Sequence, residues 1–198
     1  MSEPEHPLNH KWVLWEHKTG GSNYQENLGQ ISEFDTVEGF WKLIPHIPLP
    51  SAFFQDKKNK RLSVGNRNVV GYSLFQDGIR PCWEDPKNIE GGEWRIRKFR
   101  NLDDVDKVWQ DVVFSMIGER HNLKLRGARV VDSSNEQKRR IMYNVEVWFE
   151  DLSEKDDVEL ELMNTTGLEG GKFFFRVHQD AKEKSNLGYD SSLEKQQK

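Results

Sequence analysis

Cysteine is almost missing from this chain, and its scarcity excludes several structural solutions. Cys82 is the single cysteine among 198 residues, so neither an internal disulfide nor a zinc site built from cysteines can form. A run of about 18 apolar residues, the length that a membrane-spanning helix needs, occurs nowhere. The first ten residues, "MSEPEHPLNH", have neither a basic start nor an apolar stretch. We therefore expect no secretory signal, no membrane span and a cytoplasmic or nuclear location.

An excess of positive charge is missing as well. The formal net charge is −4, so the surface as a whole does not suit a polyanion, and any contact with nucleic acid must be local. Enzyme signatures are missing too: there is no G-x-S-x-G, no glycine-rich loop ending in Lys-Ser or Lys-Thr, and no H-E-x-x-H. His6 and His10 have the spacing of a helical metal pair, but Pro7 argues against a helix there. We expect no catalytic residue, no metal and no cofactor.

Tryptophan, by contrast, is abundant, with seven residues. Trp83 lies in "GIRPCWEDPKN", residues 78–88, where two prolines disfavour helix and strand and where Glu84 and Asp85 follow at once. In one interpretation Trp83 anchors the loop to the core and both acids are solvated. In the other, Trp83 is a stacking plate and the carboxylate beside it accepts N1–H and N2–H of guanine, the base that presents two such donors on one edge. The residues alone leave both interpretations open.

Patterns of alternating, aromatic and β-branched residues predict the strands of a sheet. In the first of them Trp12 and Leu14 are expected on one face, and Val13 and Trp15 on the other. The Trp83 loop is interpreted as a long hairpin connection between the two strands that flank it. The predicted strands are residues 11–17, 69–75, 93–99, 127–132, 139–149 and 172–178.

Three helices are predicted. The first follows Asp35 or Thr36 as its N-cap and ends before Pro45, and a third of about ten residues follows Ser153 as its N-cap. The strongest covers 102–118, where apolar residues recur at helical spacing while Phe114 lies outside their arc.

Strands and helices that do not alternate regularly predict an α+β fold. We expect a single curved antiparallel β-sheet with three helices packed on its convex face and a ligand on its concave face. One domain is expected over residues 1–181, with an inserted loop at 51–70 and a disordered tail at 182–198.

Several quoted stretches carry a family resemblance: "HPLNHKWVLW", "FDTVEGFW", "YSLFQDGIRPCWEDPKNIEGGEW" and "MIGE". In their order and approximate spacing, across residues 6–149, they are similar to the translation initiation factor 4E family, which binds the cap of messenger RNA. The resemblance implies a non-enzymatic protein that binds the 7-methylguanosine cap in translation initiation. It also implies a stacked 7-methylguanine between Tyr24 and Trp83, with Glu84 reading the base and Trp148 against the N7-methyl group. The family usually has Trp where this chain has Tyr24.

The phosphate site implied by the resemblance departs from the family pattern. The family's basic residues align with Ser133 and Asn144, and Glu93 replaces a residue that is often Arg. Counting back in twos from Trp148 leads to basic residues on the same face of the strand. This count gives Lys138 and Arg140, and Arg129 is the basic candidate on the opposing strand. The candidates for the cap phosphates are therefore Arg129, Lys138 and Arg140, with Arg139 as the alternative.

The resemblance also implies a docking site on the convex face, where the family binds a helix with a Tyr-x-x-x-x-Leu-apolar motif. The partner would be a scaffold of the initiation factor 4G type or a 4E-binding repressor. The positions that match this site are His6, Pro7, Val37, Trp41, Asp111, Phe114, Ile117 and Glu119. Residues 50–68 are expected at the opposite end of the sheet from the cap, where they would serve a different partner.

Two alternatives remain at this stage. One is a protein-interaction module with a weakened cap pocket, of the translational repressor type. The other is a cap or nucleotide hydrolase, against which "EWRIRKF" argues because it has a strand pattern and lacks the helically spaced glutamates that hold magnesium in such enzymes.

Overall fold

The computed structural model describes residues 5–22, 24–54, 63–64, 67–119, 122–134 and 141–183. Its main element is one antiparallel sheet with the strand order β2-β1-β4-β6-β7-β5-β8, and the short strand β3 pairs with the start of β4. The strands are β1 (Pro7–Lys18), β2 (Leu28–Thr36), β3 (Ser63–Val64), β4 (Arg67–Gln76), β5 (Gly92–Ile96), β6 (Leu125–Asp132), β7 (Tyr143–Phe149) and β8 (Phe173–Val177).

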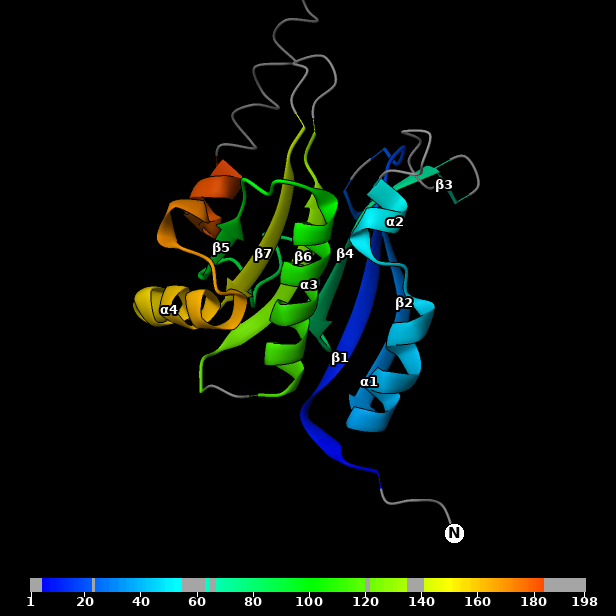
Figure 1. The fold of residues 1–198 in the computed structure, drawn as a ribbon, viewed down its shortest axis with the longest axis horizontal. Helices are drawn as coiled ribbons and strands as arrows, with labels where there is room; N and C mark the ends of the chain where they lie inside the picture. Colours follow the sequence, from blue (N-terminus) through cyan, green and yellow to red (C-terminus); the bar gives the residue numbers. More distant parts are fainter. Residues whose placement is uncertain are drawn as a thin grey trace, which may run out of the picture.

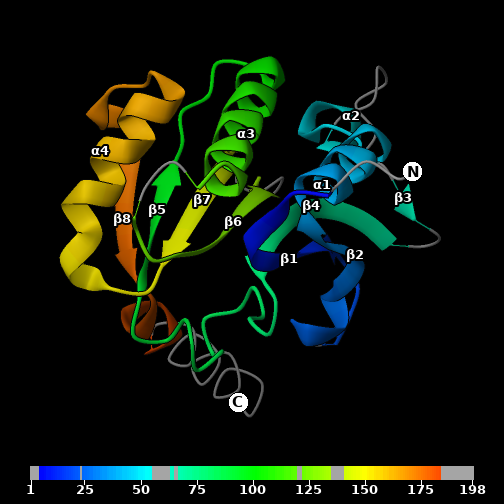
Figure 2. The same ribbon diagram turned by 90° about the horizontal axis from the view of Figure 1, so that it is seen from below.

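The α-helices between residues 37 and 166 lie on the convex face of this sheet (Figure 1), and the view from below shows the sheet curving away from them (Figure 2). The predicted α+β fold with helices on one face is therefore confirmed. Among the described residues, two helical segments were not predicted: α2, which occupies part of the expected insertion, and the short segment 178–183 after β8. The α-helices are α1 (Val37–Leu43), α2 (Pro50–Phe54), α3 (Leu102–Ile117) and α4 (Lys155–Thr166). Among the described residues, no helix is both long enough and apolar enough to cross a membrane.

Alternation along the strands separates the main core from the ligand face. Trp12 and Leu14 of β1 are buried in the main core between sheet and helices, as predicted. On the opposite face a smaller cluster consists of Phe75, Ile79 and Trp148, with Trp83 packed against it. The sheet therefore buries apolar side chains on both faces, with its larger core beneath the helices.

Two of the predicted helices begin where the sequence indicates. The Thr36 side chain accepts a hydrogen bond from the Gly39 N–H at the start of α1, and the Asn101 side chain accepts one from the Asp104 N–H at the start of α3. The prediction that Ser153 is the N-cap of the third helix is wrong. Asp151 caps the short 3₁₀ turn before α4 by accepting the Ser153 N–H, because an aspartate one turn earlier offers the same acceptor.

The Trp83 loop is not a hairpin connection, which corrects the prediction. It joins β4 to β5, and β6 and β7 lie between these two strands in the sheet. Local sequence patterns predict the strands themselves, whereas the strand order depends on pairings between distant segments. The loop therefore crosses over two strands that come later in the chain.

The other boundary predictions need smaller corrections. The expected insertion over 51–70 is narrower, because α2 extends to Phe54 and β4 begins at Arg67, while residues 55–62 and 65–66 lie outside the described part. The strand predicted over 93–99 ends at Ile96. Residues 178–183 are helical, which includes the first two residues of the predicted tail, and the rest of that prediction, 184–198, lies outside the described residues.

Candidate functional site

The Trp83 loop is held in shape by its own polar residues. Both oxygens of Asp85 accept backbone N–H groups, from Arg80 and from Lys87, each at 2.9 Å. The Asn88 side-chain amide donates to the backbone oxygens of Arg80 and Cys82, at 2.8 and 3.0 Å. These bonds satisfy the backbone of an irregular segment, so the loop is preformed.

Trp83 itself is partly buried and partly exposed. It packs against the cluster of Phe75, Ile79 and Trp148, and the guanidinium carbon of Arg176 lies 4.4 Å from its ring centroid. Its neighbour Glu84 is exposed and forms no hydrogen bond or ion pair with another described residue. One side of the Trp83 ring thus anchors the loop to the core, as in the first of the two interpretations. The Glu84 carboxylate remains available to a ligand.

Tyr24, in the loop between β1 and β2, lies close to the Trp83 loop. Its ring is 41% exposed, but its hydroxyl points into the protein and donates to the Pro81 backbone oxygen at 2.9 Å. The same hydroxyl accepts from Nη1 of Arg129 at 2.9 Å. Burial of this hydroxyl raises the pKa of Tyr24, against the opposing effect of Arg129. Arg67 holds the loop from its other end by donating to the backbone oxygens of Thr19 and Glu26, at 2.8 Å each.

Four charged side chains form a row across the concave face, on β6, β7 and β5. Arg129 donates to Glu146 through Nε at 2.8 Å and lies within 2.7 Å of it through Nη2, and Glu146 is 2% exposed. Arg95 pairs with both Glu146 and the fully buried Glu93. Two arginines thus balance two glutamates, so the row as a whole has no net charge.

The pairing of these charges shifts the pKa values of Arg129 and Glu93. Burial alone would lower the pKa of Arg129, but the Glu146 carboxylate raises it above its ordinary value. Burial alone would raise the pKa of Glu93, but His178 and Arg95 lower it to about 2. Both groups are therefore charged at neutral pH.

Two histidines lie behind the site. Nε2 of His17 lies 2.6 Å from the hydroxyl of Ser73, and its ring centroid is 6.1 Å from that of Tyr24. His178 donates from Nδ1 to the Asn88 backbone oxygen at 2.7 Å, and its ring centroid lies 4.3 Å from that of Trp148. His178 therefore fastens the end of β8 to the Trp83 loop. Among the described residues, no cluster of three or more His, Cys, Asp and Glu could hold a metal ion.

The structure places only some of the predicted site residues within reach of a ligand. Trp148 is completely buried, with the guanidinium of Arg129 at 5.3 Å from its ring. The side-chain amide of Asn144 donates to the Ser133 hydroxyl at 2.8 Å, so these two residues, at which the resemblance leads us to expect basic residues, bond to each other. Lys138, Arg139 and Arg140 lie outside the described residues.

Sequence reasoning missed three residues of this face: His17, Arg176 and His178. Alternation along "FFFRV" places Phe174 and Arg176 on one face of β8, with His178 directly after the strand, and that pattern was available in the sequence. What the sequence lacks is the register, which sets β8 beside β5 and so beside Trp83.

The convex face carries an exposed aromatic pair. Trp41 of α1 is 54% exposed and Phe114 of α3 is 38% exposed, with ring centroids 5.5 Å apart, while Phe40 beneath them is 2% exposed. The expectation that Phe114 lies outside the apolar arc of its helix is confirmed. A pair of exposed aromatic rings on neighbouring helices is typical of a protein-binding surface.

The other predicted docking residues divide into three groups. Val37 begins α1 and Pro7 begins β1, while the backbone N–H of His6 donates to the Glu38 carboxylate at 2.9 Å and so ties the chain start to α1. Asp111 pairs with Lys107, and Glu119 accepts the Asn9 N–H at 3.1 Å. Ile117 is the correction: it is 7% exposed and belongs to the core, because its position on α3 falls within the apolar arc.

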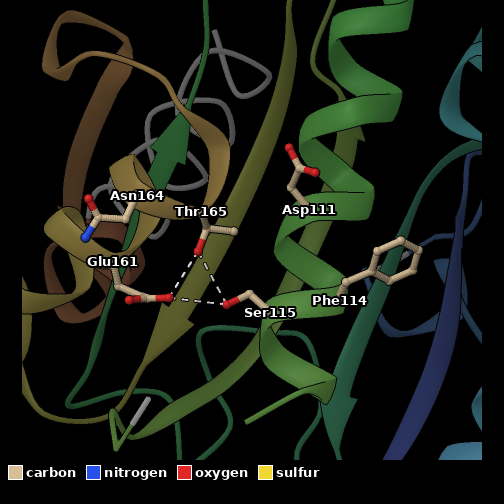
Figure 3. Close-up of a pocket in the computed structure, with 6 residues that line it drawn as sticks. All are labelled: Asp111, Phe114, Ser115, Glu161, Asn164 and Thr165. Carbon is tan, nitrogen blue, oxygen red and sulfur yellow. Dashed lines mark hydrogen bonds between the residues drawn. The ribbon is translucent and has the colours of Figure 1, made fainter. Parts of the chain in front are cut away.

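A hollow of about 440 Å³ lies beside this pair, between α3 and α4 (Figure 3). Asp111 and Phe114 come from α3, and Glu161 from α4 accepts hydrogen bonds from Ser115 at 3.4 Å and from Thr165 at 3.1 Å. Polar side chains of both helices therefore meet in the hollow, while the Phe114 ring points away from them (Figure 3).

A curved sheet with aromatic and acidic residues on loops over one face, and exposed aromatic rings on the helices of the other, defines a two-sided binding protein. Comparison with known proteins gives the family. The model of the family "Eukaryotic initiation factor 4E" matches residues 7–192, and the chain belongs to this family.

Curated relatives agree with this assignment. The eukaryotic translation initiation factor 4E of Xenopus laevis is 36% identical over 160 residues, which are 78% of this chain and 66% of that protein. The Homo sapiens protein of the same name is 43% identical over 118 residues, 58% of this chain and 48% of that protein. The chain spans about half to two thirds of the length of these relatives.

Solved structures cover more of the fold. The C. elegans eIF4E-3, in complex with the 4E-binding protein Mextli and a cap analog, is 27% identical with a TM-score of 0.72, covering 91% of this chain and 96% of that one. The Ascaris suum eIF4E-3 with m7G cap is 30% identical with a TM-score of 0.69, covering 88% and 92%.

Proposed function

We propose that this chain binds the 7-methylguanosine cap of messenger RNA on its concave face, with the guanine stacked between Tyr24 and Trp83. The observation that carries the proposal is the hydrogen bond from the Tyr24 hydroxyl to Pro81, two residues before Trp83, which holds both aromatic residues on joined loops. Each base–aromatic stack contributes about 1–3 kcal/mol. Methylation at N7 makes the purine cationic, which adds a cation–π attraction.

Glu84 is the residue that reads the base in this proposal. Both oxygens of Asp85 already accept backbone N–H groups, whereas Glu84 is exposed and has no partner among the described residues. A free carboxylate beside a stacked guanine can accept N1–H and N2–H as a charge-assisted pair. The two adjacent acids therefore have different roles, one in the loop and one in recognition.

Trp148 and the basic residues complete the proposed site. Trp148 lies beneath Trp83 as a buried floor, and it reaches the N7-methyl group only if the side chains above it move. Three N–H groups of Arg129 face Tyr24 and Glu146, so Arg129 acts on the phosphates through its charge and on the base by holding Tyr24. Lys138, Arg140 and Arg139 are the remaining candidates for the phosphates.

The relatives support this function. The Ascaris suum protein was solved with an m7G cap, and the C. elegans protein with a cap analog and Mextli. We propose the same two-sided use here: the cap on the concave face, and on the convex face the helix of a partner, either a scaffold of the initiation factor 4G type or a 4E-binding repressor. Trp41 and Phe114 would receive the apolar residues of that helix. The cytoplasm, where translation begins, is the location that this role implies.

Tryptophan fluorescence tests the proposal directly. Titration with 7-methylguanosine triphosphate should quench the fluorescence, because the ligand stacks on Trp83, and unmethylated GTP should bind more weakly. Glu84→Gln should lose roughly tenfold or more in affinity, the usual effect of a hydrogen bond to a charged group. Glu90→Gln, an exposed glutamate of the same loop, is the matched control and should bind normally. Equal affinities for the two nucleotides, or a normal Glu84→Gln variant, would contradict the proposal.

One observation favours a second candidate function. Because Ser133 and Asn144 bond to each other in place of two basic residues, the phosphate site is weaker than the family pattern provides. If the weaker phosphate site prevents cap binding, the chain is an interaction module that works through its convex face. Binding of a Tyr-x-x-x-x-Leu peptide without any binding of the methylated nucleotide would select this candidate.

A further inference from the structure

A second hollow, of about 590 Å³, opens at the end of the sheet where β5 ends and β7 and β8 begin. Its apolar lining includes Phe99, Met142 and Phe174, and its charged lining consists of Arg97, Lys98 and Arg100. No carboxylate is among the described residues that line it. In a chain with a net charge of −4, this is a local basic site with an apolar floor.

Side chains on one face of β8 lead from the proposed cap site to the hollow. Arg176 lies over the Trp83 ring at 4.4 Å, and Phe174, two residues earlier, is on the same face of the strand. Lys98 lies 5.1 Å from the centroid of the Phe174 ring, and Arg97 lies 5.3 Å from it. Cations and aromatic rings therefore alternate from Trp83 to the hollow, along the outermost strand of the sheet.

Three cations of this row, Arg176, Lys98 and Arg100, are available to a ligand, in contrast to those of the neutral row on β5 to β7. Arg176 forms no ion pair with a described residue, and the Lys98 ammonium donates to the backbone oxygen of Gly171 at 3.1 Å. The Arg100 side chain is 85% exposed, with Asp104 at 3.8 Å as its acidic neighbour. Lys98 also has a φ of 63°, which is uncommon for a residue other than glycine.

We propose that this row and hollow bind the nucleotides that follow the cap, as a single-stranded RNA segment. The phosphates contact Arg176, Lys98 and Arg100, and a base packs against Phe174 and Met142 in the hollow. Basic grooves with interleaved aromatic side chains bind single strands in this way without sequence preference. The inference rests on the proposed cap function, because the row begins at the ring on which the guanine stacks.

The experiment compares two probes, 7-methylguanosine triphosphate and a capped oligonucleotide of about ten nucleotides, a length within the usual site sizes. The variant is Lys98→Asn with Arg100→Gln, since asparagine tolerates the positive φ at position 98. The matched control, Lys11→Asn with Lys42→Gln, removes two exposed charges elsewhere on the surface. All three proteins are titrated with both probes at several salt concentrations.

We expect the unaltered protein and the control to bind the capped oligonucleotide more tightly than the mononucleotide. The variant should lose about threefold to tenfold of the oligonucleotide affinity, with its mononucleotide affinity unchanged. Its salt slope for the oligonucleotide should fall by about 0.7 for each phosphate that the variant no longer neutralises.

Three results would overturn the inference. In the first, the unaltered protein binds the mononucleotide and gains nothing from the RNA. In the second, the variant prefers the capped oligonucleotide to the mononucleotide by the same factor as the unaltered protein does. In the third, an acidic peptide rather than RNA loses affinity in the variant, which would assign the hollow to a protein partner. Failure of the mononucleotide itself to bind would instead contradict the cap function, so the two failures are distinguishable.

Discussion

The hydroxyl of Tyr24 donates a hydrogen bond to the backbone oxygen of Pro81, 2.9 Å away, and so joins two loops that are 57 residues apart in sequence. The family usually has tryptophan at this position, and an indole has no hydroxyl with which to make this bond. A tyrosine offers a smaller stacking surface, but here its ring is fixed before a ligand arrives. Fixing a contact in advance lowers the entropic cost of binding.

Tyr24→Phe tests this relationship, because it keeps the ring and removes the hydroxyl. A hydrogen bond of this kind contributes about 0.5–1.5 kcal/mol, so we expect the affinity for a cap analogue to fall by roughly twofold to tenfold. Fluorescence titration measures the change, and Tyr24→Leu, which also removes the ring, should lose more. Equal losses for phenylalanine and leucine would show that the ring does not stack.

Arg129→Met should destabilise the fold. It leaves the Glu146 carboxylate, 2% exposed, without its closest guanidinium, and breaking such a pair costs about 3–5 kcal/mol. The double variant Arg129→Met with Glu146→Leu should recover much of this loss, because no unpaired charge remains. Urea denaturation of the single and double variants measures both values. A double variant no more stable than Arg129→Met would contradict the pairing.

Substitution of Arg129 also distinguishes two ways in which this residue could contribute to cap binding. If Arg129 acts on the cap by holding Tyr24, a milder change such as Arg129→Lys should weaken binding of 7-methylguanosine and of its triphosphate by the same factor. If it contacts the phosphates, the loss should appear for the triphosphate alone.

The strands and helices were predictable where one face of an element is buried. Trp12 and Leu14 follow strand alternation, and Phe114 lies outside the arc of α3, because local periodicity determines which side chains meet the core. The strand order was not predictable in this way. "YSLF" and "EWRI" are consecutive strands, yet β6 and β7 separate them, since that arrangement depends on segments that come later in the chain.

His17 should make stability depend on pH. Burial, together with the charge of Arg129, places the pKa of His17 well below its ordinary value of 6.5. Below pH 6.5 the unfolded chain binds a proton here that the folded chain does not, so the free energy of unfolding should fall as the pH falls. The slope from this group approaches about 1.4 kcal/mol per pH unit. Urea denaturation below pH 6.5 should show a smaller slope for His17→Asn, and an unchanged slope would contradict the assignment.

Phe114→Ala and Ile117→Ala should separate binding from stability on the convex face. Phe114 is 38% exposed, so we expect its removal to change stability little and to weaken a Tyr-x-x-x-x-Leu peptide by roughly tenfold or more. Ile117 is 7% exposed in the core, so its truncation should cost about 2–5 kcal/mol of stability. Peptide titration and urea denaturation of both variants provide the test. A stable Ile117→Ala variant that fails to bind would restore Ile117 to the docking surface.

The candidate site was predictable as far as the quoted family stretches reach. The stretch around Trp83 pointed to Trp83 and Glu84, while Tyr24 lies outside the quoted stretches and followed from the alignment between them. In the structure Asp85, unlike Glu84, is used by the hydrogen bonds of the loop. The contacts of Arg129, Arg176 and His178 could not be predicted, because each depends on the register of one strand against another. A slip of one residue in the first of these registers would turn Arg176 to the other face, and a slip in the second would turn Arg129.

Because β6 and β7 lie between β4 and β5, the Trp83 loop crosses segments that the ribosome makes later than the loop itself. The floor of the site, Trp148, and the edge residues Arg176 and His178 are added last. A chain still attached to the ribosome therefore carries Trp83 and Glu84 long before it has a surface on which to place them. Ligand capture by nascent chains of increasing length would thus report the moment at which the last strand enters the sheet.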